Sequence, residues 1–231
     1  MSDLTIGLAG ARSHPVSGVI GIADVGTDQR ARCAWGASTL DYAAYHDHEW
    51  GRATDNERTL FEKLCLEGFQ SGLSWLTILR KREAFRLAFA NFEADQVAAF
   101  GGADIERLLA DAGIVRHRRK IEAAIGNARA LLKMWDGGET LADLFWSFEP
   151  LERPPVAALA DVPPKTAESA ALSNALKKRG FGFVGPTTVY AAMQAMGVVN
   201  DHLAGCWVKE SCVASRVALD RPPGAKTAHG A

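Results

Sequence analysis

Apolar residues recur every three to four positions along most of the chain, which is the spacing of helices that bury one face. This periodicity predicts helices over residues 54–68, 74–92, 103–113, 116–138, 140–148, 166–180 and 189–197. Alternation of apolar and polar residues with a period of two, which marks strands, is nearly absent. The pattern therefore predicts an all-α fold without internal repeats.

Polar residues at the ends of these segments indicate where helices begin. Thr54 and Glu57 have the spacing of a capping box, and Thr140 begins a second capping pattern. Pro186 is expected in the first turn of the helix that follows a glycine-rich stretch. A proline-rich segment, residues 149–165, is the candidate for an internal linker.

The composition is that of a folded globular protein. Apolar residues make up 48% and charged residues 23% of the 231 positions, and this length suits one compact domain. No apolar run is long enough to span a membrane, and the N-terminal residues lack the features of an export signal. Four cysteines are too few for the disulfide framework of a small secreted protein. We expect a cytoplasmic protein that does not bind membranes.

The formal net charge of -1 gives the chain no overall attraction to nucleic acid, so any such binding depends on local patches. Residues 116–120 (RHRRK) and 177–180 (KKRG) concentrate basic side chains. A solvated helix face explains either patch equally well.

Histidine and cysteine residues near both ends of the chain are of the types that bind zinc. His202 and Cys206 are four residues apart, so on a helical turn their side chains share a face. Cys33 with either His46 or His48 would complete four ligands, which describes a closed structural site and not a catalytic one. Buried free thiols, a core histidine or a disulfide between Cys33 and Cys206 would fit the same spacing.

Glu67 lies on the apolar face of the helix predicted over residues 54–68. It is seven residues beyond Leu60 and three beyond Leu64, so its carboxylate points along the stripe that faces the core. A buried carboxylate needs a cationic neighbour or ligand to stay ionised. The alternative is that Glu67 turns to solvent at the end of the helix.

Four aromatic residues, Tyr42, Tyr45, Trp50 and Trp75, occur near this acid in the sequence. Core packing explains each of them individually. Together with an inward carboxylate they describe a slot for a flat, positively charged ring that stacks on aromatic faces and is hydrogen-bonded at its edge.

A glycine-rich connection, residues 177–193 (KKRGFGFVGPTTVYAAM), runs from the basic end of one helix to the start of the next. Backbone N–H groups at such a helix start can donate to a phosphate without reading base sequence. Glycines also occur in ordinary connections between helices, so this stretch alone does not separate a DNA contact from a plain turn.

Several motifs together resemble the DNA-3-methyladenine glycosylase I family, the bacterial Tag enzymes. They are YHDHEWG, CLEGFQSGLSW, DAGIVRHRRKI, ALKKRGFGFVGPTTVYAAMQAMGVVNDH and the closing H-x3-C, in this order between about Arg32 and Trp207. The resemblance implies a helix-hairpin-helix glycosylase bundle in which a structural zinc site joins the N- and C-terminal segments. We expect a loose N-terminal extension over residues 1–31, a helical glycosylase domain over 32–207 and a flexible tail over 208–231, with Cys212 as an exposed thiol.

The resemblance also implies roles for individual residues. The implied ligands of one structural Zn²⁺ per chain are Cys33, His46, His202 and Cys206, so that His46 is preferred over His48. The implied catalytic residue is Glu67, and the implied base-binding residues are Tyr45, Trp50, Trp75 and, at the edge, Tyr42. The implied DNA-binding residues are Gly182, Gly185, Thr187 and Thr188.

The implied activity is base-excision repair by a monomeric, monofunctional enzyme. It would bind double-stranded DNA, hydrolyse the N-glycosidic bond of 3-methyladenine and leave an abasic site. Methylation at N3 makes the base cationic and a good leaving group, so recognition of the flipped base by Glu67 supplies much of the selectivity. We do not expect Asp201, beside His202, to steady the sugar cation.

Two other classes of function fit parts of the sequence. A zinc-stapled helical module would bind DNA without cutting it, and the inward carboxylate of Glu67 argues against that class. A zinc hydrolase would need an open position on the metal, which four protein ligands disfavour.

Overall fold

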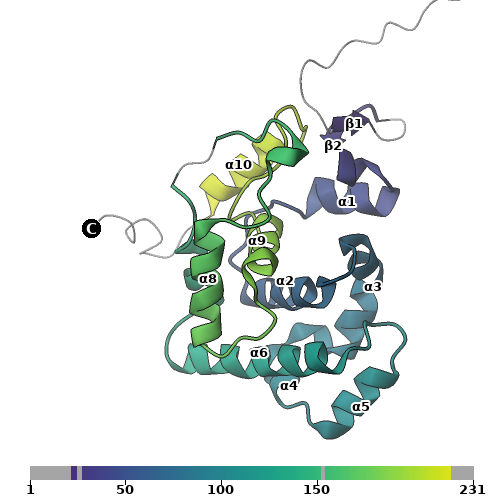
Figure 1. Ribbon diagram of the computed structural model, residues 1–231, viewed down its shortest axis with the longest axis vertical. Helices are drawn as coiled ribbons and strands as arrows, with labels where there is room; N and C mark the ends of the chain where they lie inside the picture. Colours follow the sequence, from purple (N-terminus) through teal and green to yellow (C-terminus); the bar gives the residue numbers. More distant parts are fainter. Residues whose placement is uncertain (1–21, 25–27, 152–153, 220–231) are drawn as a thin grey trace, which may run out of the picture.

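The computed structural model describes residues 22–24, 28–151 and 154–219, which fold almost entirely into helices (Figure 1). The elements are β1 (Ile22–Asp24), β2 (Ala31–Cys33), η1 (Ala34–Ala37), α1 (Leu40–His48), α2 (Glu57–Gln70), α3 (Trp75–Ala88), η2 (Ala90–Phe92), α4 (Ala94–Ala98), α5 (Gly102–Ala110), α6 (Arg118–Asp136), α7 (Leu141–Trp146), η3 (Leu159–Asp161), α8 (Ala167–Lys178), α9 (Pro186–Ala195) and α10 (Lys209–Ala218). The expectation of a predominantly helical fold is confirmed, with one short antiparallel ribbon of β1 and β2 that the pattern did not predict.

Helix α2 lies at the centre of the molecule, in contact with α3, α6, α7 and α9 (Figure 1). Every residue from Leu60 to Phe69 is buried, because neighbouring helices cover α2 on all sides. Most of these residues are apolar, but Glu62, Lys63 and Glu67 are not. Buried charges on a central helix need partners, and they therefore mark places where packing alone does not explain the sequence.

The start of α2 differs from the predicted capping box. The cap is Asn56, whose side chain accepts a hydrogen bond from the Thr59 amide, and the helix begins at Glu57. The Glu57 carboxylate instead accepts hydrogen bonds from the amides of Leu141 and Ala142, 3.0 and 2.7 Å away, at the start of α7. Glu57 is therefore a tertiary link between two helices and not part of its own helix cap.

Other predicted helix starts agree with the structure. The Thr140 hydroxyl accepts from the Asp143 amide at the start of α7, and Thr166 caps α8 in the same way through the Ser169 amide. Pro186 is the first residue of α9, where its missing N–H costs no helical hydrogen bond.

The C-terminal segment differs from the flexible tail expected over residues 208–231. Lys209–Ala218 form α10, which packs against the rest of the protein. Cys212 is fully buried, and the Ser215 hydroxyl accepts a hydrogen bond from the Ala53 amide. Arg216 also pairs with Glu149. Cys212 is thus a core residue and not an exposed thiol, whereas residues 220–231 lie outside the described part of the chain.

Helix α1 was not predicted, because its buried face includes His46 and Asp47 and gives no regular apolar repeat. Most of the expected N-terminal extension, residues 1–21 and 25–27, lies outside the described residues. Within the described ranges, none of the helices combines the length and apolar character that a membrane crossing requires.

Candidate active site and metal centre

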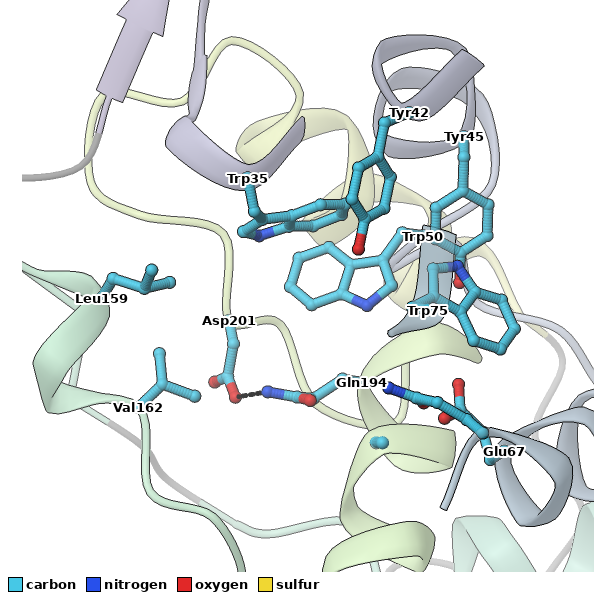
Figure 2. Close-up of a pocket in the computed structure, with 12 residues that line it drawn as sticks. Trp35, Tyr42, Tyr45, Trp50, Glu67, Trp75, Leu159, Val162, Gln194 and Asp201 are labelled. Atoms are coloured by element: carbon cyan, nitrogen blue, oxygen red, sulfur yellow. Dashed lines mark hydrogen bonds between the residues drawn. The ribbon is translucent and has the colours of Figure 1, made fainter. Parts of the chain in front are cut away.

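A pocket of about 260 Å³ opens between α1, α2 and α9. Figure 2 shows aromatic side chains along one side of it and the polar side chains of Asp201, Gln194 and Glu67 along the other. The lining residues are Trp35, Tyr42, Tyr45, Trp50, Glu67, Gln70, Trp75, Leu159, Val162, Ala191, Gln194 and Asp201. The structure therefore brings together the predicted acid and all four predicted aromatic residues.

The aromatic wall is built from three separate stretches of chain. Trp35 lies 4.9 Å from Tyr42 and 5.0 Å from Trp50 between ring centroids, and the ring of Tyr45 lies 5.4 Å from that of Trp75. Rings at these separations pack against one another and hold their orientation. The wall is thus a preformed surface on which a flat ring can stack.

The Glu67 carboxylate enters the pocket from the last turn of α2 and is only 5% exposed. Burial raises the pKa of Glu67 to about 8, and the nearby ammonium of Lys63 acts in the opposite direction. The solvent-facing alternative for Glu67 is wrong. An acid in this position favours a ligand that carries positive charge or hydrogen-bond donors.

Several pocket residues were not predicted from the sequence to line the site, including Asp201, which was considered only as the residue beside His202. Leu159 and Val162 come from the proline-rich segment, so this segment forms part of the pocket as well as connecting helices. Gln194 and Asp201 are joined by a 2.8 Å hydrogen bond, and Asp201 also accepts from the Tyr190 hydroxyl. Their periodicity is that of ordinary helix and turn residues, so only the fold reveals that they face a cavity.

Cys33, His46, His202 and Cys206 form a buried cluster whose four ligand atoms lie within 4.8 Å of one another. Cys206 Sγ is 3.4 Å from His46 Nε2 and 3.5 Å from His202 Nδ1, and Cys33 Sγ is 3.8 Å from His202 Nδ1. Bonds of about 2.3 Å from zinc to sulfur and about 2.0 Å to nitrogen give tetrahedral sulfur–nitrogen edges of about 3.5 Å. The donor set and its dimensions therefore fit a metal ion of this kind.

The surroundings of Cys206 and His46 favour the forms that bind a metal, whereas the pKa of Cys33 is raised by its hydrogen bond to Cys206 and by burial. A hydrogen bond from the Cys33 thiol holds the pKa of Cys206 well below its usual range. Asp47 binds His46 Nδ1 at 2.8 Å, which leaves Nε2 free to face the cluster. Asp47 is held in turn by the guanidinium of Arg32, at 2.7 Å. His48 is exposed and takes no part in the cluster.

The cluster adjoins the pocket. The imidazole of His202 packs edge-on against Trp50, with ring centroids 4.6 Å apart, and His46 packs against Trp35 at 5.1 Å. Asp201, which precedes His202 in the chain, lines the pocket directly. The four cluster residues thus help to position Trp35 and Trp50 in the aromatic wall and Asp201 on the polar side, besides joining segments near the two ends of the described chain.

The predicted DNA-binding residues fall into two groups. Thr187 and Thr188, in the first turn of α9, line a second cavity that shares Glu67 with the pocket, and Gly185 is the cap of α9. Gly182 faces α6 instead, where its amide donates to the Asn127 side chain at 2.7 Å. Its N–H is therefore already used within the protein, whereas the first N–H groups of α9 have no helical acceptor.

Lys120 and Arg179 of the basic patches are engaged in the fold, whereas Arg116, Arg118 and Arg119 are exposed. Lys120 is buried and donates to the carbonyls of Phe69 and Ser71, at 2.9 and 2.6 Å, at the end of α2. Arg179 pairs with Glu139. Lys177 and Lys178 remain exposed at the end of α8.

Comparison with known proteins gives consistent matches over most of the chain. A family model described as methyladenine glycosylase matches residues 35–210. DNA-3-methyladenine glycosylase 1 of Escherichia coli (strain K12) is 52% identical over 178 residues, covering 76% of this chain and 95% of the relative. DNA-3-methyladenine glycosylase of Haemophilus influenzae is 48% identical over 183 residues, covering 78% and 98%. A solved structure of Staphylococcus aureus 3-methyladenine DNA glycosylase I, described as showing the basis of 3-methyladenine recognition, is 37% identical with a TM-score of 0.73, covering 77% of this chain and 96% of that one.

Proposed function

The chain belongs to the methyladenine glycosylase family, and from this premise we infer that it excises 3-methyladenine from alkylated DNA in base-excision repair. The main structural support for this inference is the Glu67 carboxylate, which is buried beneath the aromatic wall of the pocket. This arrangement favours a flat cation over a neutral apolar ligand, which would leave the buried acid without a partner.

The chemistry follows from the charge of the base. The N-glycosidic bond of the cationic 3-methyl-2′-deoxyadenosine in DNA breaks with its electron pair moving to the base, which leaves as a neutral molecule. Water adds to the resulting oxocarbenium-like sugar and loses a proton, which gives an abasic site. Because the cation is already a good leaving group, the protein's main tasks are to extract, bind and orient the base.

We assign these tasks to the residues of the pocket. Tyr45, Trp50 and Trp75 stack on the flipped base, and Tyr42 closes the edge of the slot. Glu67 accepts hydrogen bonds from the base and counters its charge. The duplex is held by the α8–α9 turn, as a helix-hairpin-helix, with Gly185, Thr187 and Thr188 at the phosphate backbone. Gly182 shapes the turn and does not donate to DNA.

For the metal cluster we propose one Zn²⁺ bound by Cys33, His46, His202 and Cys206. Four protein ligands leave no position for water or substrate, so the role of the ion is structural. Its contacts through His202 and His46 with Trp50 and Trp35 make it a support for the pocket as well.

Incubation with double-stranded DNA treated with a methylating agent tests this function. We expect free 3-methyladenine in the supernatant, identified by chromatography, and alkali-labile abasic sites in the DNA. Untreated DNA serves as the substrate control. Binding of the methylated duplex without release of any base would leave only a DNA-binding role.

A further inference from the structure

Lys63 is a lysine buried behind the aromatic wall of the pocket. It lies on α2 one turn before Glu67 and is only 6% exposed. Its ammonium is 4.5 Å from the ring centroid of Tyr45, 5.4 Å from that of Trp75, and 3.5 Å from the Tyr45 hydroxyl. Removing an ammonium from water is costly, so a packing role alone would be better served by an apolar side chain.

The carboxylates beside Lys63 do not balance its charge fully. Glu49 lies 3.7 Å from the ammonium but also binds the Arg82 guanidinium, at 2.9 Å. Glu62 is bound by Arg86, at 2.8 Å. The remaining acid on the same face of α2 is Glu67, at the i+4 position, where side chains on a helix are neighbours.

The surroundings of this pair are mixed in charge. The titratable and charged groups that face it are Tyr42, Tyr45 and Glu49 from α1 and its end, Glu62 from α2, Arg82 and Arg86 from α3, and Asp201 from the segment after α9.

We propose that Lys63 is a positioning residue for base recognition: its ammonium is the internal counter-cation that favours the carboxylate form of Glu67 against the effect of burial, while it supports Tyr45 and Trp75 from behind. This inference rests on the proposed function, since it concerns how the pocket is prepared for a cationic base. Burial favours the neutral form of Glu67, and a neutral acid cannot compensate the charge of the base, so a nearby cation lowers the free-energy cost of ionising Glu67. On binding, the cationic base becomes the direct partner of Glu67.

The direction of the pKa shifts agrees with this role. Burial raises the pKa of Glu67, and Lys63 is the group that lowers it. Burial lowers the pKa of Lys63, and the carboxylates of Glu49 and Glu67 raise it. Each of the two groups therefore favours the charged form of the other.

The test is a titration of Glu67 in the full-length, zinc-loaded protein by NMR of ¹³C-labelled glutamate carboxyls, with the resonance assigned through Glu67→Gln. In Lys63→Met, which keeps the length and shape of the side chain without its charge, the midpoint of Glu67 should rise by about one pH unit or more. In Lys63→Arg it should stay near the wild-type value. Lys133→Met, at an exposed position on α6, is the matched control and should leave the midpoint unchanged.

In Lys63→Met, the fall in the single-turnover rate of excision at low pH should move to higher pH together with the Glu67 midpoint. Coincident titration curves for Glu67 in wild type and Lys63→Met would overturn the proposal, even if excision were normal. If Lys63→Met does not fold, Lys63→Gln, which can still reach the Tyr45 hydroxyl, provides the same comparison. Because the titration requires no turnover, failure of the proposed function appears separately as absence of base release.

Discussion

At the scale of single residues, the pocket is distinguished by two buried charged side chains. Glu67 and Lys63 are both nearly inaccessible to solvent, yet both sit on a helix whose other buried side chains are mostly apolar. Burying either one without a partner would favour its neutral form. Each of the two groups favours the charged form of the other, and the aromatic wall supplies shape and stacking.

Glu67→Gln should reduce excision of 3-methyladenine by about 10- to 100-fold, because the amide forms a hydrogen bond but carries no charge to set against the cationic base. The comparison is single-turnover release from methylated duplex. Glu83→Gln is the control, since Glu83 is largely exposed on α3 and pairs only at the surface with Arg86. Equal rates for Glu67→Gln and wild type would remove this carboxylate from recognition.

The pH dependence of excision follows from the raised pKa of Glu67, about 8 in the unliganded protein. The carboxylate is the active form, so kcat/KM should increase with pH, about tenfold per unit below the midpoint, and level off above it. For Glu67→Gln, kcat/KM should not show this increase with pH. A wild-type profile that is flat from about pH 6 to 9 would contradict the assignment.

At the scale of elements, helices are joined by side chains that cap a neighbour. Glu57 begins α2 and supplies both carboxylate oxygens to the start of α7, besides accepting from the indole N–H of Trp135. An acid at a helix N-terminus satisfies free N–H groups and interacts favourably with the helix dipole. Glu57 therefore helps to fix the orientation of α7 against the central helix, together with the buried face of α7 and the hydrogen bond from the Trp146 indole N–H to the Thr54 carbonyl.

Glu57→Ala should lower the free energy of unfolding by about 1 to 3 kcal/mol, because the first amides of α7 lose their acceptor. Urea denaturation followed by circular dichroism measures this loss. Glu122→Ala, an exposed substitution on α6 whose acid lies 3.9 Å from Arg118, should change the free energy by less than about 0.5 kcal/mol. Equal unfolding midpoints for the two variants would show that the α7 link contributes nothing.

Local sequence patterns predict elements better than they predict links between elements. The caps at Thr140 and Thr166 depend on residues three positions apart, and both are found in the structure. The capping box at Thr54 has an equally good local pattern, but the Glu57 carboxylate is used by α7, 84 positions away in the chain. Helix α10 was missed for a related reason: Val213 and Val217 are exposed, so its apolar repeat does not match its buried face.

The candidate site was predictable where residue type carries the information. An inward acid, four aromatics and a set of thiols and imidazoles are unusual enough to be recognised, and the structure places them as two adjoining clusters. Gln194 and Lys63 could not be selected in this way, because glutamine and lysine are ordinary helix residues. Their roles depend on where the folded chain places their side chains relative to the pocket.

At the scale of the whole molecule, the metal cluster joins segments that are far apart in the chain. Two members of the cluster come from residues 33 and 46 and two from residues 202 and 206, and every helix from α2 to α9 lies between them. Binding of an ion to such a cluster closes a very long loop and adds its binding free energy to that of folding. The stability of the molecule and its metal content are therefore expected to change together.

Cys206→Ala should release the metal and lower Tm by on the order of 10 °C, as a loss of roughly 3 kcal/mol implies for a domain of this size. Metal analysis and calorimetry on the same sample check both effects. Cys65→Ala is the matched control, since Cys65 is a buried thiol of α2 outside the cluster and its loss should lower Tm modestly while the metal is retained. A Cys206→Ala protein with full metal content would refute the ligand assignment.

The separation of the ligands along the chain also has a consequence for biosynthesis. Translation delivers Cys33 and His46 long before His202 and Cys206, so a nascent polypeptide exposes only half of a chelating set for most of its synthesis. Metallation must then be a late event, after the intervening helices have brought the two halves together. Cells starved of the ion during translation should accumulate apoprotein whose helical body is formed but whose damage-recognition surface is incompletely ordered, and supplying the ion afterwards should restore it.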